Sequence, residues 1–409
     1  MYKIILSIET HFLCEKRNYE MNNLNFLIER LCPNGVMYRP LEQCCSILDN
    51  RRKPVTKAAR EAGEYPYYGA NGIQDYVSDY IFDGTFVLVG EDGSVVTPAG
   101  TPVVTWATGK IWVNNHAHII EEKDGVLLRF LFHYLQTVNV SPLIHGNIPK
   151  LTGGDFRAIR IPLPPLPVQQ EIVRILDNFT ELTAELTAEL AARRKQYEHY
   201  RDELLTTPAD STMMALGAIA DYRRGSFPQP YGNSEWYGGV GAMPFVQVAD
   251  VEENGMVLRE QTKQQISVVA QPKSVYVPAG TVICSIQGSI GRVAITQYDA
   301  YVDRTLAIFE KYKTDINKRY FAYQIQRKFG IEKEFARGST LKTITKEEFT
   351  KFEIPVPPIT EQERIVSVLD RFDTLCNDLT SGLPAEITAR QKQYEYYRDK
   401  LLTFKELEG

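Results

Sequence analysis

The sequence has few cysteines and no long apolar segment, and both absences limit what the protein can be. Its six cysteines form no C-x-x-C pair, so neither a zinc site of common spacing nor a disulfide framework is expected. Plain thiols of this kind are typical of a reducing compartment, and we expect a cytoplasmic protein. No run approaches the roughly 20 apolar residues of a membrane span, so no membrane partner is expected. The apolar patch Ile4–Ile8 is too short for a secretory signal.

The chain also lacks the excess of basic residues that many nucleic-acid-binding proteins carry, since its formal net charge is −5. The charge is unevenly distributed. Residues 166–206 have 5 basic and 8 acidic side chains, and residues 354–409 have 7 and 10, whereas residues 212–353 have 18 and 15. Residues 39–160 are nearly balanced, with 12 and 13. The acidic charge lies in segments that we expect to be helical, so the charge distribution allows a DNA partner without requiring one.

An internal repeat organises the chain. The segment "IPLPPLPVQQEIVRILDNFTEL" (161–182) matches "IPVPPITEQERIVSVLDRFDTL" (354–375) at an offset of 193 residues, and "RRKQYEHYRDELLT" (193–206) matches "RQKQYEYYRDKLLT" (390–403) at an offset of 197. A weaker match links residues 27–33 to residues 202–208 at an offset of 175. The sequence therefore predicts two tandem units, each a globular part followed by a proline-rich hinge and a long helix.

The globular parts are expected to be mixed α/β, because β-rich runs such as "TFVLVG" and "TVICSI" alternate with helix-like segments. The predicted fold class is thus α/β of the mixed α+β kind, with two globular domains separated by two long antiparallel coiled-coil helices in a pseudo-twofold tandem repeat. Residues 1–20 precede a segment that begins like a domain, and we interpret them as an extension from a misplaced start codon. The predicted divisions are an extension at 1–20, a first globular domain at 21–165, a central helix at 166–206, a second globular domain at 207–357 and a distal helix at 358–409.

Both long helices are predicted from one continuous apolar stripe. From Val168 to Thr206 the first helix would span roughly 58 Å at about 1.5 Å per residue. Gly382 and Pro384 interrupt the second stripe, so a break or a new helix start is expected there. A narrow stripe of this length must pack on a partner, and the other long helix is the obvious one.

The stretch "TELTAELTAEL" (180–190) nearly repeats a tetrapeptide inside the central helix. Four residues lengthen a helix by about 6 Å and rotate its end by about 40° beyond one turn. One base-pair step of DNA rises about 3.4 Å and turns about 34°. One tetrapeptide therefore changes separation and phase by an amount comparable to one or two base pairs. The segment is either a ruler that sets the separation of the two globular parts or a slipped repeat tolerated in an exposed helix.

These motifs, in this order, resemble the DNA-specificity subunits of type I restriction–modification systems. The resemblance covers residues 21–404 and is carried by "IPLPPLPVQQEIVRILDNF", "KQYEHYRDELL", "IPVPPITEQERIVSVLDRFD" and "GLPAEITARQKQYEYYRDKLLTF". It implies two recognition domains that each read one half of a split DNA site, and two helical regions that dock partner subunits. Some relatives vary such tetrapeptides, and the non-specific spacer of their site changes with the copy number. The first 20 residues and the tetrapeptide run depart from the family pattern.

The same resemblance implies the partners. These are double-stranded DNA, two modification subunits that methylate adenine at N6, and two restriction subunits that cleave distant DNA after ATP-driven translocation. S-adenosylmethionine, ATP and magnesium would be used by the partner subunits, so no cofactor is expected on this chain.

Motifs for catalysis are missing from this chain, and no catalytic residue is predicted. The segments "LPPL" and "VPPI" lack the Asn and the aromatic residue of the N-P-P-Y-type tetrad that holds a flipped adenine. The sequence around Lys110 lacks the spacing and hydroxyl of a phosphate-binding P-loop. Asp92 with Glu121 and Lys123 matches a D…E-x-K nuclease pattern that is common by chance. His116 and His118 share a strand face but have no evident third ligand, so no metal is predicted.

Candidate DNA contacts are phosphate-binding basic side chains and base-reading polar ones. The loop "YPYYGANG" adds aromatic rings and an Asn that could pair with adenine, although an ordinary turn with packed tyrosines is the alternative. In the first domain the candidates are Arg51, Arg52, Lys53, Lys57, Tyr67, Tyr68, Asn71, Lys110, Asn147 and Lys150. In the second domain they are Arg223, Arg224, Ser226, Gln287, Ser289, Arg292, Arg304, Arg337, Ser339, Thr340 and Lys342.

Candidate docking residues for the partner subunits lie on the matched ends of the two long helices, where a solvated coiled-coil flank is the alternative. They are Gln196, Tyr197, Tyr200 and Arg201 on the central helix, and Gln393, Tyr394, Tyr397 and Arg398 on the distal helix. The function predicted as a whole is non-catalytic DNA recognition for a type I complex. The alternatives are a fused enzyme with its own methyltransferase or nuclease site, and a coiled-coil scaffold without DNA specificity.

Overall fold

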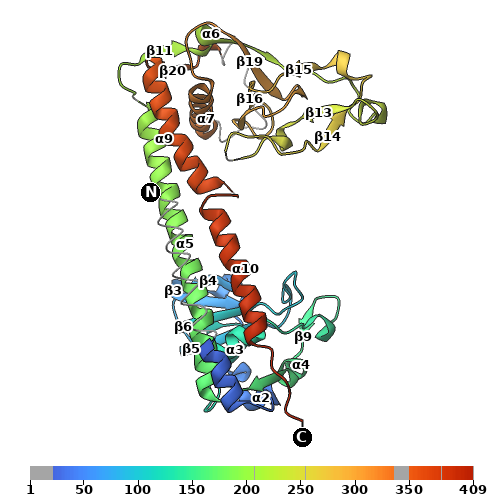
Figure 1. Cartoon of the computed structure of the whole chain (residues 1–409), viewed down its shortest axis with the longest axis vertical. Coiled ribbons are helices and arrows are strands. Elements are labelled where there is room, and N and C mark those ends of the chain that lie inside the picture. The colour runs from blue at the N-terminus through green and yellow to red at the C-terminus, as the bar shows by residue number, and fades with distance from the viewer. Residues whose placement is uncertain (1–21, 207, 254, 336–349, 379, 409) are drawn as a thin grey trace. The chain divides into compact units, whose positions relative to one another are not determined.

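The computed structural model describes residues 22–206, 208–253, 255–335, 350–378 and 380–408. The chain divides into two compact units (Figure 1). Unit 1 comprises residues 1–184 with 389–409, and unit 2 comprises residues 185–388. The expected extension at residues 1–20 lies outside the described part. Among the described helices, none is long and apolar enough to cross a bilayer.

Unit 1 is built on a six-stranded sheet with the order β2-β7-β5-β6-β3-β4. All neighbouring strands in it are antiparallel except β3 and β6. The strands are β2 (Ser46–Ile47), β3 (Ala62–Gly69), β4 (Gly72–Val77), β5 (Phe82–Gly90), β6 (Val104–Val113) and β7 (Ala117–Glu121). Smaller pairs join β1 (Met37–Pro40) to β10 (Arg160–Leu163), and β8 (Ile144–His145) to β9 (Lys150–Leu151).

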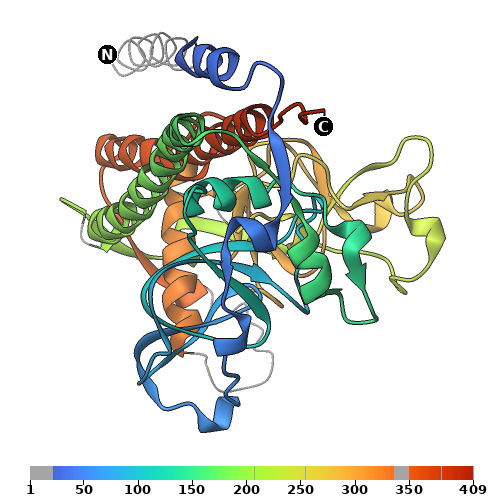
Figure 2. The ribbon, with the colours of Figure 1, turned by 90° about the horizontal axis from the view of Figure 1, so that it is seen from below.

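Unit 1 also contains several short helices, of which α3 (Leu128–Leu135) packs on the central strands β5 and β6. A helix of residues 22–31 precedes β1 (Figure 2), and Leu24 on it is fully buried in the core. The others are α2 (Leu41–Cys44), η1 (Asp49–Arg51), η2 (Lys57–Ala59), α3 (Leu128–Leu135), η3 (Ser141–Leu143) and α4 (Gly153–Ala158).

The run "TFVLVG" is apolar throughout because β5 is buried on both faces. Val87 and Val89 belong to the core shared with the long helices, whereas Phe86 and Leu88 belong to a second cluster on the opposite face. Successive side chains of a strand point to opposite faces, so both sets must be apolar. Trp106 and Trp112 lie on one strand of ten residues, β6.

Unit 2 contains two four-stranded sheets, ordered β12-β19-β16-β17 and β14-β13-β18-β15. Their strands are β12 (Ala220–Arg224), β13 (Met243–Val246), β14 (Gln264–Ile266), β15 (Val275–Val277), β16 (Val282–Ser285), β17 (Val293–Ile295), β18 (Ala300–Val302) and β19 (Leu306–Tyr312). A further pair joins β11 (Thr212–Ala215) to β20 (Glu353–Val356). The shorter helices are α6 (Leu216–Ile219), η4 (Ser234–Trp236), η5 (Val248–Asp250) and η6 (Gln271–Lys273), and the longer one is α7 (Lys318–Phe335).

Three long helices carry the matched segments. The helix α5 (Leu166–Thr206) has 41 residues, about 60 Å at 1.5 Å per residue, and passes from unit 1 into unit 2. Its first part packs in unit 1 against the end of α10 (Leu383–Leu401), where Phe179 stacks on Tyr397 with ring centroids 5.3 Å apart. Its last part packs in unit 2 against α9 (Ile359–Asn377), where Phe372 lies between Tyr197 and Tyr200. Within each unit the paired segments run antiparallel, as predicted.

The predicted interruption of the distal helix is confirmed. The helix α9 ends at Asn377, and α10 begins at Leu383 with Pro384 in its first turn. A side chain at Gly382 would place a Cβ 2.5 Å from the carbonyl oxygen of Thr374, so only glycine fits there. The proline lacks an N–H, which a first helical turn does not need.

The internal repeat is visible in the strand registers. The β1–β10 pair aligns Met37 with Leu163, and the β11–β20 pair aligns Thr212 with Val356. These positions differ by the same offsets of 175 and 193 residues that the sequence shows. In each unit the strand pair holds the start of the globular part against the hinge before the long helix.

A buried glutamine closes the same hinge in both units. The side-chain amide of Gln169 donates to the carbonyls of Gly125 and Pro164 and accepts from the backbone N–H of Leu127. Gln362 makes the matching bonds in unit 2, to the carbonyls of Asp315 and Pro357 and from the N–H of Asn317. Both side chains are almost fully buried. Each glutamine satisfies backbone groups that the proline-rich hinge leaves without a helical or strand partner.

The C-terminal tail completes unit 1. The backbone of Val36 donates to Lys405 and accepts from Leu407, each at 2.9 Å. The side chains of Arg160 and Glu406 form a two-pronged ion pair with distances of 2.6 and 3.1 Å. The last residues of the chain therefore lie beside β1 and fasten the first domain.

Replacing Gln169 by Ala is expected to lower the free energy of unfolding by about 2 kcal/mol, because buried backbone groups lose their partners. The corresponding change Gln362→Ala should have an effect of similar size in unit 2. Urea titration of the full chain measures both, with the exposed Gln391→Ala as the control. A loss no larger than that of the control would contradict the hinge role of these glutamines.

Candidate nucleic-acid interface

Basic and aromatic side chains gather on one face of the sheet in unit 1. Lys110 and Trp112 are two residues apart on β6 and so point to the same face. The Lys110 ammonium lies 4.7 Å from the ring centroid of Tyr80 and 5.9 Å from that of Tyr65. The Lys53 ammonium lies 5.8 Å from the ring of Trp112, whose indole N–H donates to the carbonyl of Lys53 at 2.6 Å.

We call Lys53, Tyr65, Tyr80, Lys110 and Trp112 the basic–aromatic surface. The nearby rings Tyr80 and Tyr65 raise the pKa of Lys110, so its charge is maintained. Cations over aromatic faces can contact phosphate while the rings remain available for stacking. Of these five, Lys53 and Lys110 were predicted, and the alternation in "KIWV" is the signal that would have added Trp112.

The structure corrects two predicted contacts in the loop "YPYYGANG". Tyr67 and Tyr68 are 1% and 7% exposed, so their rings cannot offer a face to DNA. The Tyr67 hydroxyl is bonded to the backbone of Val55, and its ring packs beneath Arg60 and Trp112. The alternative of a turn with packed tyrosines holds for these two residues, whereas Asn71 is exposed.

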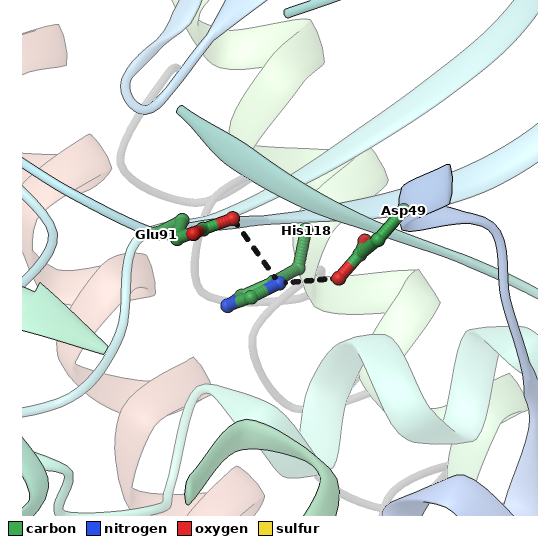
Figure 3. A group of neighbouring side chains, drawn as sticks. All are labelled: Asp49, Glu91 and His118. Carbon is green, nitrogen blue, oxygen red and sulfur yellow. Dashed lines mark hydrogen bonds and ion pairs between the residues drawn. The ribbon is translucent and has the colours of Figure 1, made fainter. Parts of the chain in front are cut away.

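A charged cluster is formed by Asp49 on η1, Glu91 just after β5 and His118 on β7 (Figure 3). Asp49 and Glu91 approach the same ring nitrogen of His118, with oxygens 2.7 and 3.6 Å from Nδ1. The other ring nitrogen lies 3.1 Å from the carbonyl oxygen of Leu151. Phe156 stacks on the imidazole at 4.2 Å. Both ring nitrogens of His118 therefore face oxygen atoms.

Arg52 and Lys150 place positive charge next to the carboxylates of Asp49 and Glu91. The Arg52 guanidinium lies 2.6 Å from Glu91 and 3.7 Å from Asp49, and the Lys150 ammonium lies 3.2 Å from Glu91. Burial acts to raise the pKa of Asp49, but hydrogen bonds from His118 and from a backbone N–H hold that pKa below its ordinary value. Asp49, Glu91 and His118 could present three ligand atoms to a metal. The cations already present neutralise them, so the cluster is a salt-bridge network.

This network changes the interpretation of Arg52. Its side chain is only 12% exposed and also donates to the carbonyl of Ala117. The prediction of a phosphate anchor is therefore wrong for Arg52, which holds η1, β5 and β7 together. The neighbouring Arg51, Lys53 and Lys57 are exposed.

The cluster also positions the hairpin formed by β8 and β9. Lys150 and Leu151 of β9 contact it directly, and Asn147 stands exposed in the turn of the hairpin. The backbone of Leu151 donates to Glu91, which fixes the hairpin against the end of β5. The predicted contacts Asn147 and Lys150 thus lie on a supported, solvent-exposed hairpin.

The nuclease-like trio is not assembled. Asp92 pairs with His116 before the start of β7, whereas Glu121 stands at the end of that strand. The Lys123 ammonium contacts the carbonyl of Gln43. The length of a strand separates the first carboxylate from the second, so the pattern in the sequence does not form one site.

One predicted residue of unit 2, Arg304, lies beside an aromatic cluster. Phe227 stacks on Tyr231, Tyr237 and Phe245, and the exposed Arg304 lies 5.2 Å from the ring of Tyr231. The aromatic members of this cluster were not predicted, although "GSFPQPY" contains two of them.

The other candidates of unit 2 differ in their exposure. Gln287 and Ser289 are exposed on the loop between β16 and β17. Arg292, at the end of that loop, bonds to the carbonyl of Val251 and pairs with Glu253, so its guanidinium is already engaged. Arg223 is exposed but paired with Glu310 at 3.1 Å.

Two further candidates of unit 2 lie on β12 and just after it. Arg224 is exposed on β12, and the hydroxyl of Ser226 donates to the carbonyl of Lys273. Four predicted residues lie outside the described residues, and these are Arg337, Ser339, Thr340 and Lys342.

Most of the predicted docking residues contact other side chains of this chain. Tyr394 and Tyr397 pack in the core of unit 1, and Tyr197 packs on the core of unit 2. Arg201 and Arg398 pair with the aspartate that follows each of them. The side chains of Gln196 and Gln393 accept from Arg193 and Arg390. Tyr200 is 38% exposed and Tyr396, which was not predicted, is 62% exposed.

Comparison with known proteins identifies the family. The model of the type I restriction modification DNA specificity domain matches residues 33–193 and again residues 208–389. The chain belongs to this specificity-domain family. It is 38% identical over 399 residues to a protein of Haemophilus influenzae named as a type I restriction enzyme specificity subunit, covering 94% of this chain and 99% of that one. It is 34% identical over 298 residues to a type I restriction enzyme specificity subunit of Escherichia coli, covering 69% and 72%.

The fold of the specificity family is found in solved structures as well. The S subunit of a type I restriction–modification system of M. genitalium has a TM-score of 0.55 at 14% identity, and the match covers 90% of this chain and 96% of that one. A second chain, from a study of assembly of the type I system, also has a TM-score of 0.55 at 18% identity and covers 90% and 97%. The predicted tandem fold class is thereby confirmed.

The structure separates the role of Arg52 from that of Lys53. Arg52→Met should lower the free energy of unfolding by about 3 kcal/mol, because two buried carboxylates lose a partner. Lys53→Met should change it by less than about 0.5 kcal/mol, since an exposed side chain is removed. Urea titration of the full chain measures both. An Arg52→Met protein that is as stable as the Lys53→Met control would restore Arg52 as a candidate anchor.

Proposed function

We propose that this chain is the DNA-recognition subunit of a type I restriction–modification complex. Each specificity domain reads one half of a split target, and the long helices connect the two readers. The observation that carries the proposal is the tandem match of the specificity-domain model to both globular parts, together with the near-complete alignment to a relative that is named as a specificity subunit.

Two structural features support recognition of two different half-sites. The first domain presents its basic–aromatic surface on a six-stranded sheet, and the second presents the exposed Arg304 over the partly buried ring of Tyr231, in a domain built on two four-stranded sheets. Phosphate contacts from such cations fix position, whereas base edges are read by side chains whose placement depends on the local fold. Two surfaces of different construction favour a target whose halves differ in sequence.

The chain works without its own catalytic centre in this proposal. Two modification subunits dock on it and methylate adenine with S-adenosylmethionine, and two restriction subunits use ATP and magnesium to translocate and cleave. The DNA contacts are made by the exposed candidates of each domain. Such a complex acts on DNA in the cytoplasm.

The proposal is tested by co-expression with the modification subunit and single-molecule mapping of N6-methyladenine. One split motif with a fixed gap is the expected result. Methylation in a continuous motif would contradict reading by two domains, and no methylation by an assembled complex would favour a scaffold. Incubating the purified chain alone with DNA and S-adenosylmethionine is the control, and methyl transfer by it would favour a fused enzyme.

The tetrapeptide run is proposed as the ruler of the gap. It lies entirely within α5, its leucines are only partly buried, and the division between the two units falls inside it, between Ala184 and Glu185. Deleting one copy, residues 183–186, is expected to change the gap of the methylated motif by one or two base pairs, because the helix loses about 6 Å. An unchanged gap in an active complex would show that the run is a tolerated repeat.

A further inference from the structure

A buried polar chain joins three helical segments in unit 1. The carboxylate of Asp177, on α5, accepts from Arg129 at 2.7 Å and from His133 at 2.8 Å, both on α3. The other ring nitrogen of His133 lies 2.9 Å from the hydroxyl of Tyr394 on α10. His133 is fully buried. The helices α3, α5 and α10 therefore meet where the ring of His133 lies between the carboxylate of Asp177 and the phenol of Tyr394.

Unit 2 contains the same arrangement from the corresponding residues. Asp370, on α9, accepts from Arg319 at 2.9 Å and from the hydroxyl of Tyr323 at 2.7 Å, both on α7. Tyr197 on α5 is an electrostatic neighbour of the Tyr323 hydroxyl. The two sets are related by the offsets of the repeat. The arginine and the ring are shifted by 190 residues, the aspartate by 193 and the outer tyrosine by 197.

We call each set a relay, consisting of an outer tyrosine, a bridging ring and an aspartate. In unit 1 a neutral His133 donates from Nε2 to Asp177 and accepts at Nδ1 from the Tyr394 hydroxyl. In unit 2 the Tyr323 hydroxyl donates to Asp370 at 2.7 Å, and the outer tyrosine Tyr197 is its neighbour. Histidine and tyrosine thus perform the same task, which is to donate to the aspartate from a position next to an outer tyrosine.

Each bridging ring lies on a helix that also packs on the recognition sheet. The helix α3 contacts β5 and β6, and Arg129 lies 4.7 Å from the ring of Trp106 on β6. The helix α7 contacts β16 and β17, and Phe321 on it lies 5.0 Å from Phe309 on β19. A change in the relay therefore tilts the helix that carries the recognition sheet.

Apolar packing alone does not fix this tilt, because it is non-directional. Hydrogen bonds to a carboxylate have preferred distances and angles, and a misaligned one leaves a polar atom of the buried bridging ring, His133 or Tyr323, without its partner. The relay favours one orientation of each domain on its pair of helical segments, since other orientations break two or three of these bonds.

We propose that the two relays are positioning elements that set the orientation of each specificity domain on the long helices and thereby restrict the complex to one spacer length. This inference rests on the proposed function, in which the domains read two half-sites across a fixed gap. The relay residues touch no DNA in this proposal. They act through the angle at which a domain presents its reading surface.

The inference predicts what happens when a relay is broken without loss of a ring. Tyr394→Phe removes one hydroxyl but keeps the ring, which lies 5.9 Å from the ring of His133, and His133→Phe removes both nitrogens from the bridging position. Methylation at spacers one base pair shorter or longer should rise about tenfold relative to the native spacer, the factor that one hydrogen bond to a charged network contributes. The bases read in each half-site should not change.

His133→Tyr is the matched control because it places in unit 1 the ring that unit 2 uses. It should keep the native spacer preference, as should Tyr396→Phe, a change at an exposed tyrosine on the same helix. Tyr323→Phe tests the second relay independently. If a broken relay lowers methylation at all spacer lengths in the same proportion, or changes nothing, the positioning role is overturned.

The histidine adds a second readout. Burial lowers the pKa of His133 from 6.5, with help from Arg129 on α3 and Arg398 on α10, while the charge of Asp177 on α5 and its hydrogen bond act in the opposite direction. Tyr394 on α10 faces the other ring nitrogen. Since folding lowers this pKa, the unfolded chain binds the proton more readily, and the stability present at pH 7.5 is lost as the pH falls below 6.5.

The experiment measures methylation by the assembled complex on a set of DNA targets that differ only in spacer length. It compares the unmodified chain with the variants that break a relay and with the matched controls. The unmodified chain must show one split motif, and its failure to do so would overturn the proposed function together with this inference. Relaxed spacing only in the broken relays supports the inference. Urea midpoints of the full chain at pH 7.5 and 5.8 should fall less for His133→Tyr than for the unmodified chain, and an equal fall would contradict the assigned role of His133.

Discussion

The whole structure depends on the burial of the apolar stripe of α5, which no single neighbouring segment accomplishes. In unit 1 the stripe is covered by the domain that precedes it and by the last turns of α10, including Leu401. In unit 2 the end of the same helix is covered by α9, through Ile365 and Leu369. A helix of 41 residues with an exposed apolar stripe would not be stable in water, so both units require the C-terminal part of the chain. The first domain is therefore complete only when the last residues have been added and fastened beside Val36.

Polar contacts then select one arrangement from those that apolar packing allows. The hinge glutamines Gln169 and Gln362 satisfy backbone groups next to the prolines, and Asp177 and Asp370 bind the domain helices to the long helices. These contacts recur at corresponding positions in both units, whereas the recognition sheets differ. The repeat thus preserves the joint between domain and helix, and leaves the surfaces proposed to contact DNA free to diverge.

Buried charges in the first domain serve the fold in the same way. Arg52 and His118 neutralise Asp49 and Glu91 and hold the hairpin that carries Asn147 in place. The side chain of Arg52 is thereby largely buried, although Arg51 and Lys53 on either side of it are exposed. The exposed neighbours Lys53 and Lys110 lie instead over aromatic rings, where their charges face solvent.

The sequence by itself determined the tandem repeat, the mixed fold class, the long central helix and the break at Gly382, because periodicity, proline and glycine act locally and leave a direct pattern. It also determined the family, since the motifs on the long helices are extended and ordered. Tertiary structure decided which candidates remain at the surface. Tyr67 and Arg52 are buried by segments that are distant in sequence. A local sequence pattern does not indicate which distant segment will cover a given side chain. The relay of Asp177, His133 and Tyr394 joins residues from three separate parts of the chain, so only the folded structure could bring it together.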